Sequence, residues 1–258
     1  MNDVLMLTAD ELTYLAGQNE YVPGIVPAGA YGSETWAKVE LEAENSLVRK
    51  GLLKRSFGGR RTPAPELAEL LGLCLRYERA AVWQWQKADG EVGTQRCYGK
   101  DGTWLSIVDE GELRQLRIVP VQELAHSAQL LPGVESAHPE ELRGELRKLH
   151  FKKIARLLLR GSSVEAAQLL AEYEMPERSR QLLLKGLQQQ ADCFSLLLAQ
   201  RGPDQVEAKS VSLLTDGTDC VEFYQHIAED DRTMIGLRPA EQGQYPELKK
   251  ELAAWLIG

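Results

Sequence analysis

At 258 residues, the chain is long enough to bury one large hydrophobic core or two smaller ones. Hydrophobic residues make up 43% and charged residues 26%, an ordinary globular balance that excludes a wholly disordered chain. The formal net charge of −8 argues against a scaffold for nucleic acid or a basic membrane-surface protein, although it leaves room for a local basic patch.

The N-terminus predicts a short helix that begins with a capping box. The Thr8 hydroxyl can accept from the backbone N–H of Glu11, whose carboxylate can reach back. The apolar run before it is too short for a signal peptide, and no later run is long enough to cross a bilayer. The four cysteines are widely separated, which is typical of isolated thiols in a reducing compartment. We therefore expect a cytoplasmic protein.

A longer amphipathic helix is predicted from Ser33 to Lys50, with Gly51 as its C-cap. The corner at 47–53 has two interpretations. In the first, it ends a winged-helix unit with a β wing at 54–61 that binds DNA or an effector, and five basic side chains contact phosphates: Lys50, Lys54, Arg55, Arg60 and Arg61. In the second, it is a structural corner whose charges are solvated. We favour the second, because the acidic residues of the helix lie where DNA would approach.

A first β-meander is predicted after a helix at 67–74. Its apolar or alternating runs lie at 82–85, 92–98, 104–108 and 116–119. Asp-Gly pairs at 89–90 and 101–102 separate them and are good hairpin signals. The aromatic residues of these runs could line a ligand cleft or stack on bases, but their strand spacing favours packing on a sheet face: Trp83, Trp85, Tyr98 and Trp104.

The breaker-rich stretch at 131–139 is the predicted internal boundary. It divides the chain into halves at 1–133 and 139–258, which we expect to pack as one compact unit. Three helices are predicted beyond it. The first covers 140–160, the second follows a capping box formed by Ser162 and Glu165, and the third begins at Pro176.

A second meander with a terminal helix is predicted from Asp192 to Leu256. The connections are too short for parallel crossovers, so the strands should pair antiparallel. Because helix, meander and helix follow in the same order in both halves, we read the halves as related by duplication. The predicted fold is α+β, with two duplicated halves that each combine helices with an antiparallel β-meander.

The sequence carries no recognisable catalytic motif. It contains no nucleophile elbow, P-loop, dinucleotide glycine fingerprint or His-Glu-x-x-His pattern. The four histidines are not spaced as metal ligands. We therefore expect no catalytic residue, no cofactor and no metal, and a protein that is not an enzyme. A catalytic site without a motif would instead need clustered carboxylates with shifted pKa values in a deep pocket.

Six stretches, in their order along the chain, resemble the EspG family of type VII (ESX) secretion-associated proteins: 7–12 (LTADEL), 49–53 (RKGLL), 65–71 (PELAELL), 211–217 (VSLLTDG), 235–240 (IGLRPA) and 248–256. The resemblance implies a quasi-two-fold α+β fold whose central sheet is flanked by helical bundles. It also implies a cytoplasmic chaperone that binds a helical secretion substrate and masks its aggregation-prone tip.

In that case the helices and meander of the second half would be the docking surface. The chain departs from the family in the Gln- and Lys-rich helix at 181–190 and in its overall composition. The resemblance therefore transfers no individual binding residue and does not identify the substrate. The oligomeric state also stays open between monomer and homodimer.

Overall fold

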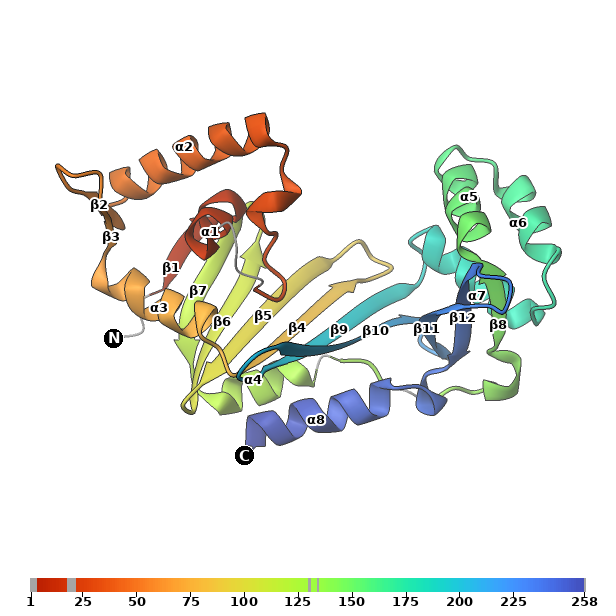
Figure 1. Ribbon diagram of the computed structural model, residues 1–258. Coiled ribbons are helices and arrows are strands. Elements are labelled where there is room, and N and C mark those ends of the chain that lie inside the picture. Colours follow the sequence, from red (N-terminus) through yellow and green to blue (C-terminus); the bar gives the residue numbers. More distant parts are fainter. Residues whose placement is uncertain (1–3, 18–21, 130, 134, 258) are drawn as a thin grey trace.

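The computed structural model describes residues 4–17, 22–129, 131–133 and 135–257. Its centre is one ten-stranded antiparallel sheet, ordered β1-β7-β6-β5-β4-β9-β10-β11-β12-β8 (Figure 1). From either end, this order gives an edge strand and then a four-stranded meander that leads to the central β4–β9 pair. The predicted α+β class and central antiparallel sheet are confirmed, whereas the duplication and the boundaries of the two halves stay predictions.

The first meander has the predicted strands, with longer bounds: β4 (Arg79–Gln86), β5 (Val92–Lys100), β6 (Thr103–Glu110) and β7 (Leu113–Val119). Asp101 and Gly102 both have positive φ, as a tight turn between β5 and β6 requires. The edge strand β1 (Leu5–Thr8) pairs with β7 and was not predicted. It has only four residues and leads directly into a helix, so its alternation is too brief to recognise.

The second meander also follows the prediction: β9 (Asp192–Arg201), β10 (Val206–Thr215), β11 (Cys220–Ile227) and β12 (Thr233–Pro239). Its edge strand β8 (Gly144–Arg147) lies where we predicted a helix over 140–160, so that prediction was wrong for its first part. Leu142 and Leu146 are both buried, and a spacing of four residues fits one face of either a helix or a strand.

The two meanders meet where β4 pairs with β9 along the length of both strands. Trp83 lies opposite Leu196 in this register, and Leu196 lies opposite Val211 of β10. All three side chains are buried beneath the helices α4 (Val121–Ala128) and α8 (Tyr245–Ile257), which cover this face of the sheet (Figure 1). Trp104 belongs to the same core. The predicted packing role is therefore confirmed for Trp83 and Trp104, and Tyr98 is buried in the core of the opposite face.

Two helical groups stand on that opposite face, one at each end (Figure 1). The first contains α1 (Ala9–Ala16), α2 (Ser33–Arg49) and α3 (Pro65–Leu75), with the small hairpin β2 (Leu53–Arg55) and β3 (Arg61–Pro63). The second contains α5 (Lys148–Leu159), α6 (Ser163–Ala171) and α7 (Glu177–Leu187). Each group has its own hydrophobic core against the sheet. Within the described ranges, no helix combines the length and the apolar character needed to cross a bilayer.

The two predicted capping boxes have different outcomes. The box at α1 is confirmed, with Glu11 N donating to Thr8 Oγ1 at 3.1 Å and Thr8 N donating to Glu11 Oε2 at 2.7 Å. The prediction of a capping box at α6 was wrong, because the Ser162 side chain makes no capping hydrogen bond. Ser162 N donates instead to Leu157 O at 2.9 Å, so this residue belongs to the tight turn that ends α5.

Candidate binding surfaces

No helix of the described residues covers the middle of the sheet face between the two helical groups (Figure 1). A groove lies there, here called the saddle. It has a volume of about 410 Å³ and runs across β4, β5, β9, β10 and β11. Small or polar side chains line much of it: Gln84, Gln86, Thr94, Cys193, Ser195 and Ser212. Three aromatic residues also line it, Trp85, Phe194 and Phe223, of which Trp85 and Phe194 pack partly against the core of the opposite face. At Ser195 and Ser212 the sheet backbone is covered only by short side chains.

Strand register explains why these residues share one face. Gln84 lies opposite Ser195, and Ser195 lies opposite Ser212. Ser195 Oγ donates to Gln84 Oε1 at 3.4 Å across the β4–β9 pair. Because side chains alternate between faces, the neighbouring Leu196 and Leu213 point into the core on the other side. The central strands thus have one packed face and one solvated face.

Cys193 lies in this saddle and is only partly buried. Its pKa is raised above the usual value, mainly because burial disfavours the thiolate and also because Asp192 carries a negative charge. The thiol is therefore protonated at neutral pH. It is a weak nucleophile but remains accessible from the groove.

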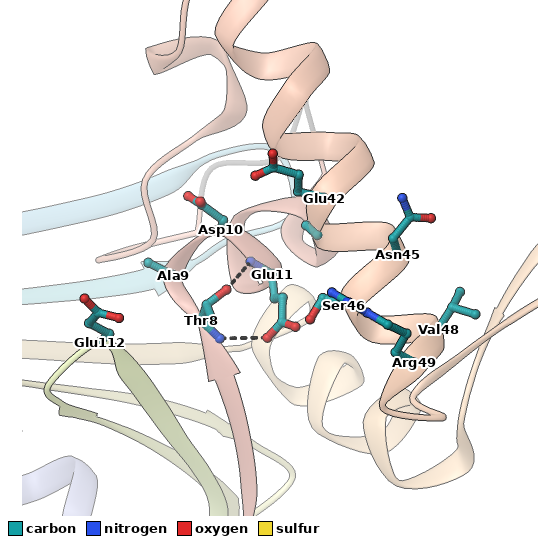
Figure 2. A pocket seen from close by; sticks show the side chains of 11 residues that line it. Thr8, Ala9, Asp10, Glu11, Glu42, Asn45, Ser46, Val48, Arg49 and Glu112 are labelled. Atoms are coloured by element: carbon teal, nitrogen blue, oxygen red, sulfur yellow. Dashed lines mark hydrogen bonds between the residues drawn. The ribbon is translucent and has the colours of Figure 1, made fainter.

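A second groove, of about 850 Å³, lies between α1 and α2 and is open to solvent (Figure 2). Acidic side chains line it: Asp10, Glu11, Glu42 and Glu112. Glu11 is buried, and its Oε2 accepts from both Thr8 N and the Lys50 ammonium at 2.7 Å. Lys50 is the first of the five basic residues that the winged-helix interpretation assigns to phosphate contacts, and here its ammonium pairs with a carboxylate of the chain itself.

The hairpin β2–β3 carries the other four predicted basic residues. Arg55 and Arg61 both bind the buried carboxylate of Glu44 on α2, at 2.6 Å each. Lys54 and Arg60 are exposed on the hairpin. The structure thus brings four of these cations together on one hairpin, but internal carboxylates compensate two of the four.

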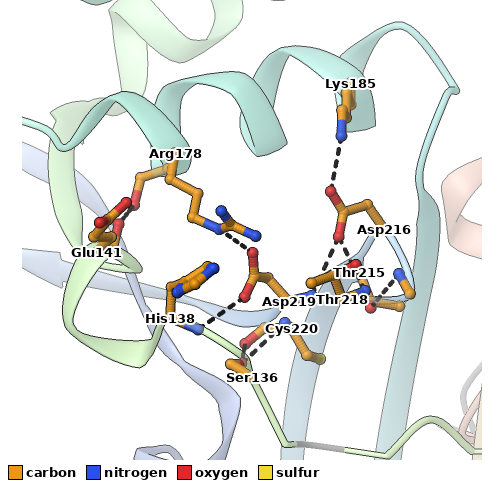
Figure 3. A network of polar contacts seen from close by, with 12 residues as sticks. Ser136, His138, Glu141, Arg178, Lys185, Thr215, Asp216, Thr218, Asp219 and Cys220 are labelled. Atoms are coloured by element: carbon orange, nitrogen blue, oxygen red, sulfur yellow. Dashed lines mark hydrogen bonds and ion pairs between the residues drawn. The ribbon is translucent and has the colours of Figure 1, made fainter.

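A polar network ties the connection between the halves to the β10–β11 turn (Figure 3). The buried Asp219 carboxylate binds the Arg178 guanidinium and accepts from the backbone N–H of His138 at 3.3 Å. Ser136 accepts from the backbone N–H of Cys220 at 3.1 Å. Burial raises the pKa of the Cys220 thiol to about 12, with smaller contributions from nearby carboxylates. This cluster is structural, because its groups bond to one another.

Our prediction from sequence missed the saddle, although one signal was present. Ser195 interrupts the apolar run that begins at Cys193, and Ser212 sits between Val211 and Leu213. Serine at alternate positions of an apolar strand indicates one solvated face. The pairing of β4 with β9 was needed to bring the two halves' polar positions together.

Comparison with solved structures shows a structural likeness, whereas the sequence comparisons find no match. No protein-family model matches the chain, and neither does any curated protein. A solved structure that it resembles is that of the Mycobacterium tuberculosis type VII secretion system chaperone EspG5 in complex with a PE25–PPE41 dimer. The sequences are 12% identical, the alignment covers 92% of this chain and 91% of the other, and the TM-score is 0.49. Both similarity values are low, so residue roles do not transfer.

Proposed function

We propose that this chain is a non-enzymatic cytoplasmic chaperone or adaptor that binds a helical secretion substrate in the saddle. The observation that carries the proposal is the uncovered middle of the sheet. An antiparallel sheet can leave one face in water, and here two helical groups flank that face as walls. A partner helix can lie on such a floor and meet the walls on both sides.

The chemistry of the floor supports a protein partner. Ser195 and Ser212 are short, so they let a partner approach the sheet closely while still offering hydroxyl groups for hydrogen bonds. Phe223 adds an apolar contact at one side of the groove. An interface of this kind takes its affinity from a few apolar anchors surrounded by polar groups.

The secretion part of the proposal has a different basis. It follows from the resemblance of the six sequence stretches named above to the EspG family, and it supplies the class of partner. The saddle supplies only the place where such a partner binds. The absence of an enzymatic activity is likewise part of the proposal.

The test is affinity purification of the tagged full chain from its native host, with mass spectrometry and a mass measurement of the eluted complex. We expect a stoichiometric complex with a small helical secreted protein. A bulky double substitution on the floor, Ser195→Trp with Ser212→Trp, should abolish its recovery because two indole rings fill the groove.

Ser33→Trp is the matched control, since it adds the same ring to an exposed serine at the start of α2, away from the saddle. Circular dichroism and thermal melting should show that all variants fold. Recovery of the chain alone would overturn the proposal, and so would recovery only with nucleic acid that elutes at high salt. If the partner binds the double variant as well as it binds the original chain, the saddle is not its binding site.

A further inference from the structure

One side of α5 carries a cationic stripe. Lys152, Lys153, Arg156 and Arg160 are all exposed, and Leu149 lies among them. Because an α-helix has about 3.6 residues per turn, these five positions fall within roughly a third of its circumference. The opposite side, around Ile154, packs into the core of the second helical group. The stripe therefore runs along the whole outer side of the helix.

These four charges are not compensated by the chain. Among the residues that the structure describes, none of the four side chains forms an ion pair or a hydrogen bond. Several exposed lysines elsewhere have acidic partners, as in Lys209 with Glu251 and Lys185 with Asp216, whereas Lys54 on the hairpin has none among the described residues. In a chain with a net charge of −8, a stripe without acidic partners is a marked local reversal of sign.

Stability of the helix does not account for the charges at its start. The first turn of α5 contains no acidic residue, and the N-cap Arg147 makes no side-chain capping bond. Positive groups near a helix N-terminus oppose the macrodipole and lower helix stability. Lys148 lies in this first turn and opposes the macrodipole, whereas Arg156 lies in the last turn and is favoured by it. Lys152 and Lys153 lie between the two ends, so helix-end electrostatics gives no reason for their charges.

Exposed apolar side chains accompany the stripe. Leu149 is 74% exposed within it, and Leu159 and Val164 are 85% and 73% exposed at the α5–α6 turn. Positive charge beside exposed leucine is complementary to a helix that carries both carboxylates and apolar residues. The negative charge of the rest of the chain would repel a long polyanion or an anionic bilayer, but not a short acidic helix.

We propose that α5 docks an acidic amphipathic helix of the protein partner. Carboxylates of that helix pair with Lys152, Lys153 and Arg156, and its apolar residues contact Leu149 and Leu159. This inference rests on the proposed function, because it assumes that the partner is a helical protein. It adds the chemistry of the recognised segment and a second contact region outside the saddle.

The probe is a fluorescent synthetic peptide that is helical and carries leucine and glutamate on one side. Its binding to the full chain is measured by fluorescence anisotropy over a series of salt concentrations. We expect saturable binding that weakens as salt rises, because the pairs are exposed and screened. The triple variant Lys152→Glu, Lys153→Glu, Arg156→Glu should weaken binding by about tenfold or more.

A peptide in which every glutamate is replaced by lysine gives the reciprocal test. It should bind the triple variant and not the original chain, a swap that general loss of folding cannot produce. The matched control is Lys38→Glu, Lys54→Glu, Lys250→Glu, which changes net charge equally at exposed positions off α5. This control should bind the acidic peptide as the original chain does.

Failure of the acidic peptide to bind, or equal binding by the triple variant, would overturn the inference. So would equally tight, stripe-dependent binding of single-stranded DNA or of phosphatidylserine vesicles, which would make the stripe a general polyanion surface. The saddle variant Ser195→Trp with Ser212→Trp should still bind the acidic peptide. The saddle variant tests the proposed function and the triple variant tests this inference, so either proposal can fail without the other.

Discussion

Arg61 Nη2 lies 2.6 Å from Glu44 Oε2, so a buried carboxylate on α2 holds the outer strand of the β2–β3 hairpin. Arg55 binds the other carboxylate oxygen from the neighbouring strand. The two guanidinium groups cover Glu44 while remaining about half exposed themselves. The basic hairpin is thereby fastened to the acidic helix, and two of its charges are already paired.

Glu44→Gln should destabilise the chain by about 1 kcal/mol, because it replaces charge-assisted hydrogen bonds with neutral ones. Burial raises the pKa of Glu44, but the hydrogen bonds and charges of Arg55 and Arg61 outweigh burial. The pKa of Glu44 therefore lies below its usual value of 4.5. A depressed pKa stabilises the fold above the unfolded value and loses that contribution as the pH falls through the folded value. Urea unfolding should show the difference in unfolding free energy between the two proteins at pH 7, and its progressive loss as the pH falls from 4.5 through the lower folded pKa. A pH-independent difference would contradict this assignment.

Gly236→Ala should destabilise the chain by about 1–3 kcal/mol through overpacking. A Cβ atom at this position would lie 2.1 Å from Tyr224 Cζ, so the tyrosine ring would have to move. Its displacement would also break the 3.1 Å hydrogen bond from Tyr224 to Glu145 on the edge strand β8. Gly58→Ala is the control, since no atom lies within 4 Å of its Cβ position. Equal thermal midpoints for the two variants would show that the Tyr224 ring is not packed as described.

Asp219→Asn should cost about 1–3 kcal/mol, because the buried carboxylate is the shared acceptor for Arg178 and the His138 backbone. Hydrogen–deuterium exchange should speed up locally at 135–142 and at the β10–β11 turn. Asp204→Asn is a suitable control, since Asp204 is exposed in the β9–β10 turn. Unchanged exchange at 135–142 would mean that the connection is held by other contacts.

Cys193 should be the first cysteine that a small alkylating reagent modifies in the native protein. Cys74, Cys97 and Cys220 are buried, and burial also raises the pKa of the Cys97 and Cys220 thiols. Mass spectrometry of a labelling time course would give the order. If a partner occupies the saddle, it should slow the labelling of Cys193 and leave the other three unchanged. Faster reaction at Cys220 would contradict the network in Figure 3.

Leu149→Glu should raise the stability of the isolated chain by about 0.5 kcal/mol and weaken its binding of the acidic peptide. The new carboxylate lies in the first turn of α5, where it interacts favourably with the helix macrodipole. It also removes an apolar contact and adds a repulsive charge to the stripe. Leu149→Gln separates the two effects, since it removes the apolar side chain without the charge. A drop in stability for the glutamate variant would show that Leu149 packs more tightly than its exposure indicates.

Local signals were sufficient to predict most elements of the sheet. Asp101 and Gly102 marked a tight turn, and alternation marked both meanders, because these patterns depend on a few neighbouring residues. The edge strand β8 was missed, since the spacing of Leu142 and Leu146 fits two periods. The capping box at Ser162 failed for a similar reason, because a neighbouring turn competed for the same residue.

The candidate binding surfaces were harder to predict. The saddle depends on the pairing of Gln84 with Ser195, which joins strands from different halves, and no local pattern reports it. The five basic residues at the 50–61 corner were visible in the sequence. The pairing of Lys50 with Glu11, and of Arg55 and Arg61 with Glu44, depends on tertiary packing and could only be seen in three dimensions.

The β4–β9 seam has a consequence for biosynthesis. While the chain is being made, β4 leaves the ribosome long before β9. The nascent first half can pair β4 with β5, but the other edge of β4, which carries Val82 and Trp83, has no partner strand yet. Such an edge can template pairing with another chain. Pairing with β9 covers this edge once the second half has been made. The risk of self-association is therefore highest while synthesis of the second half is incomplete.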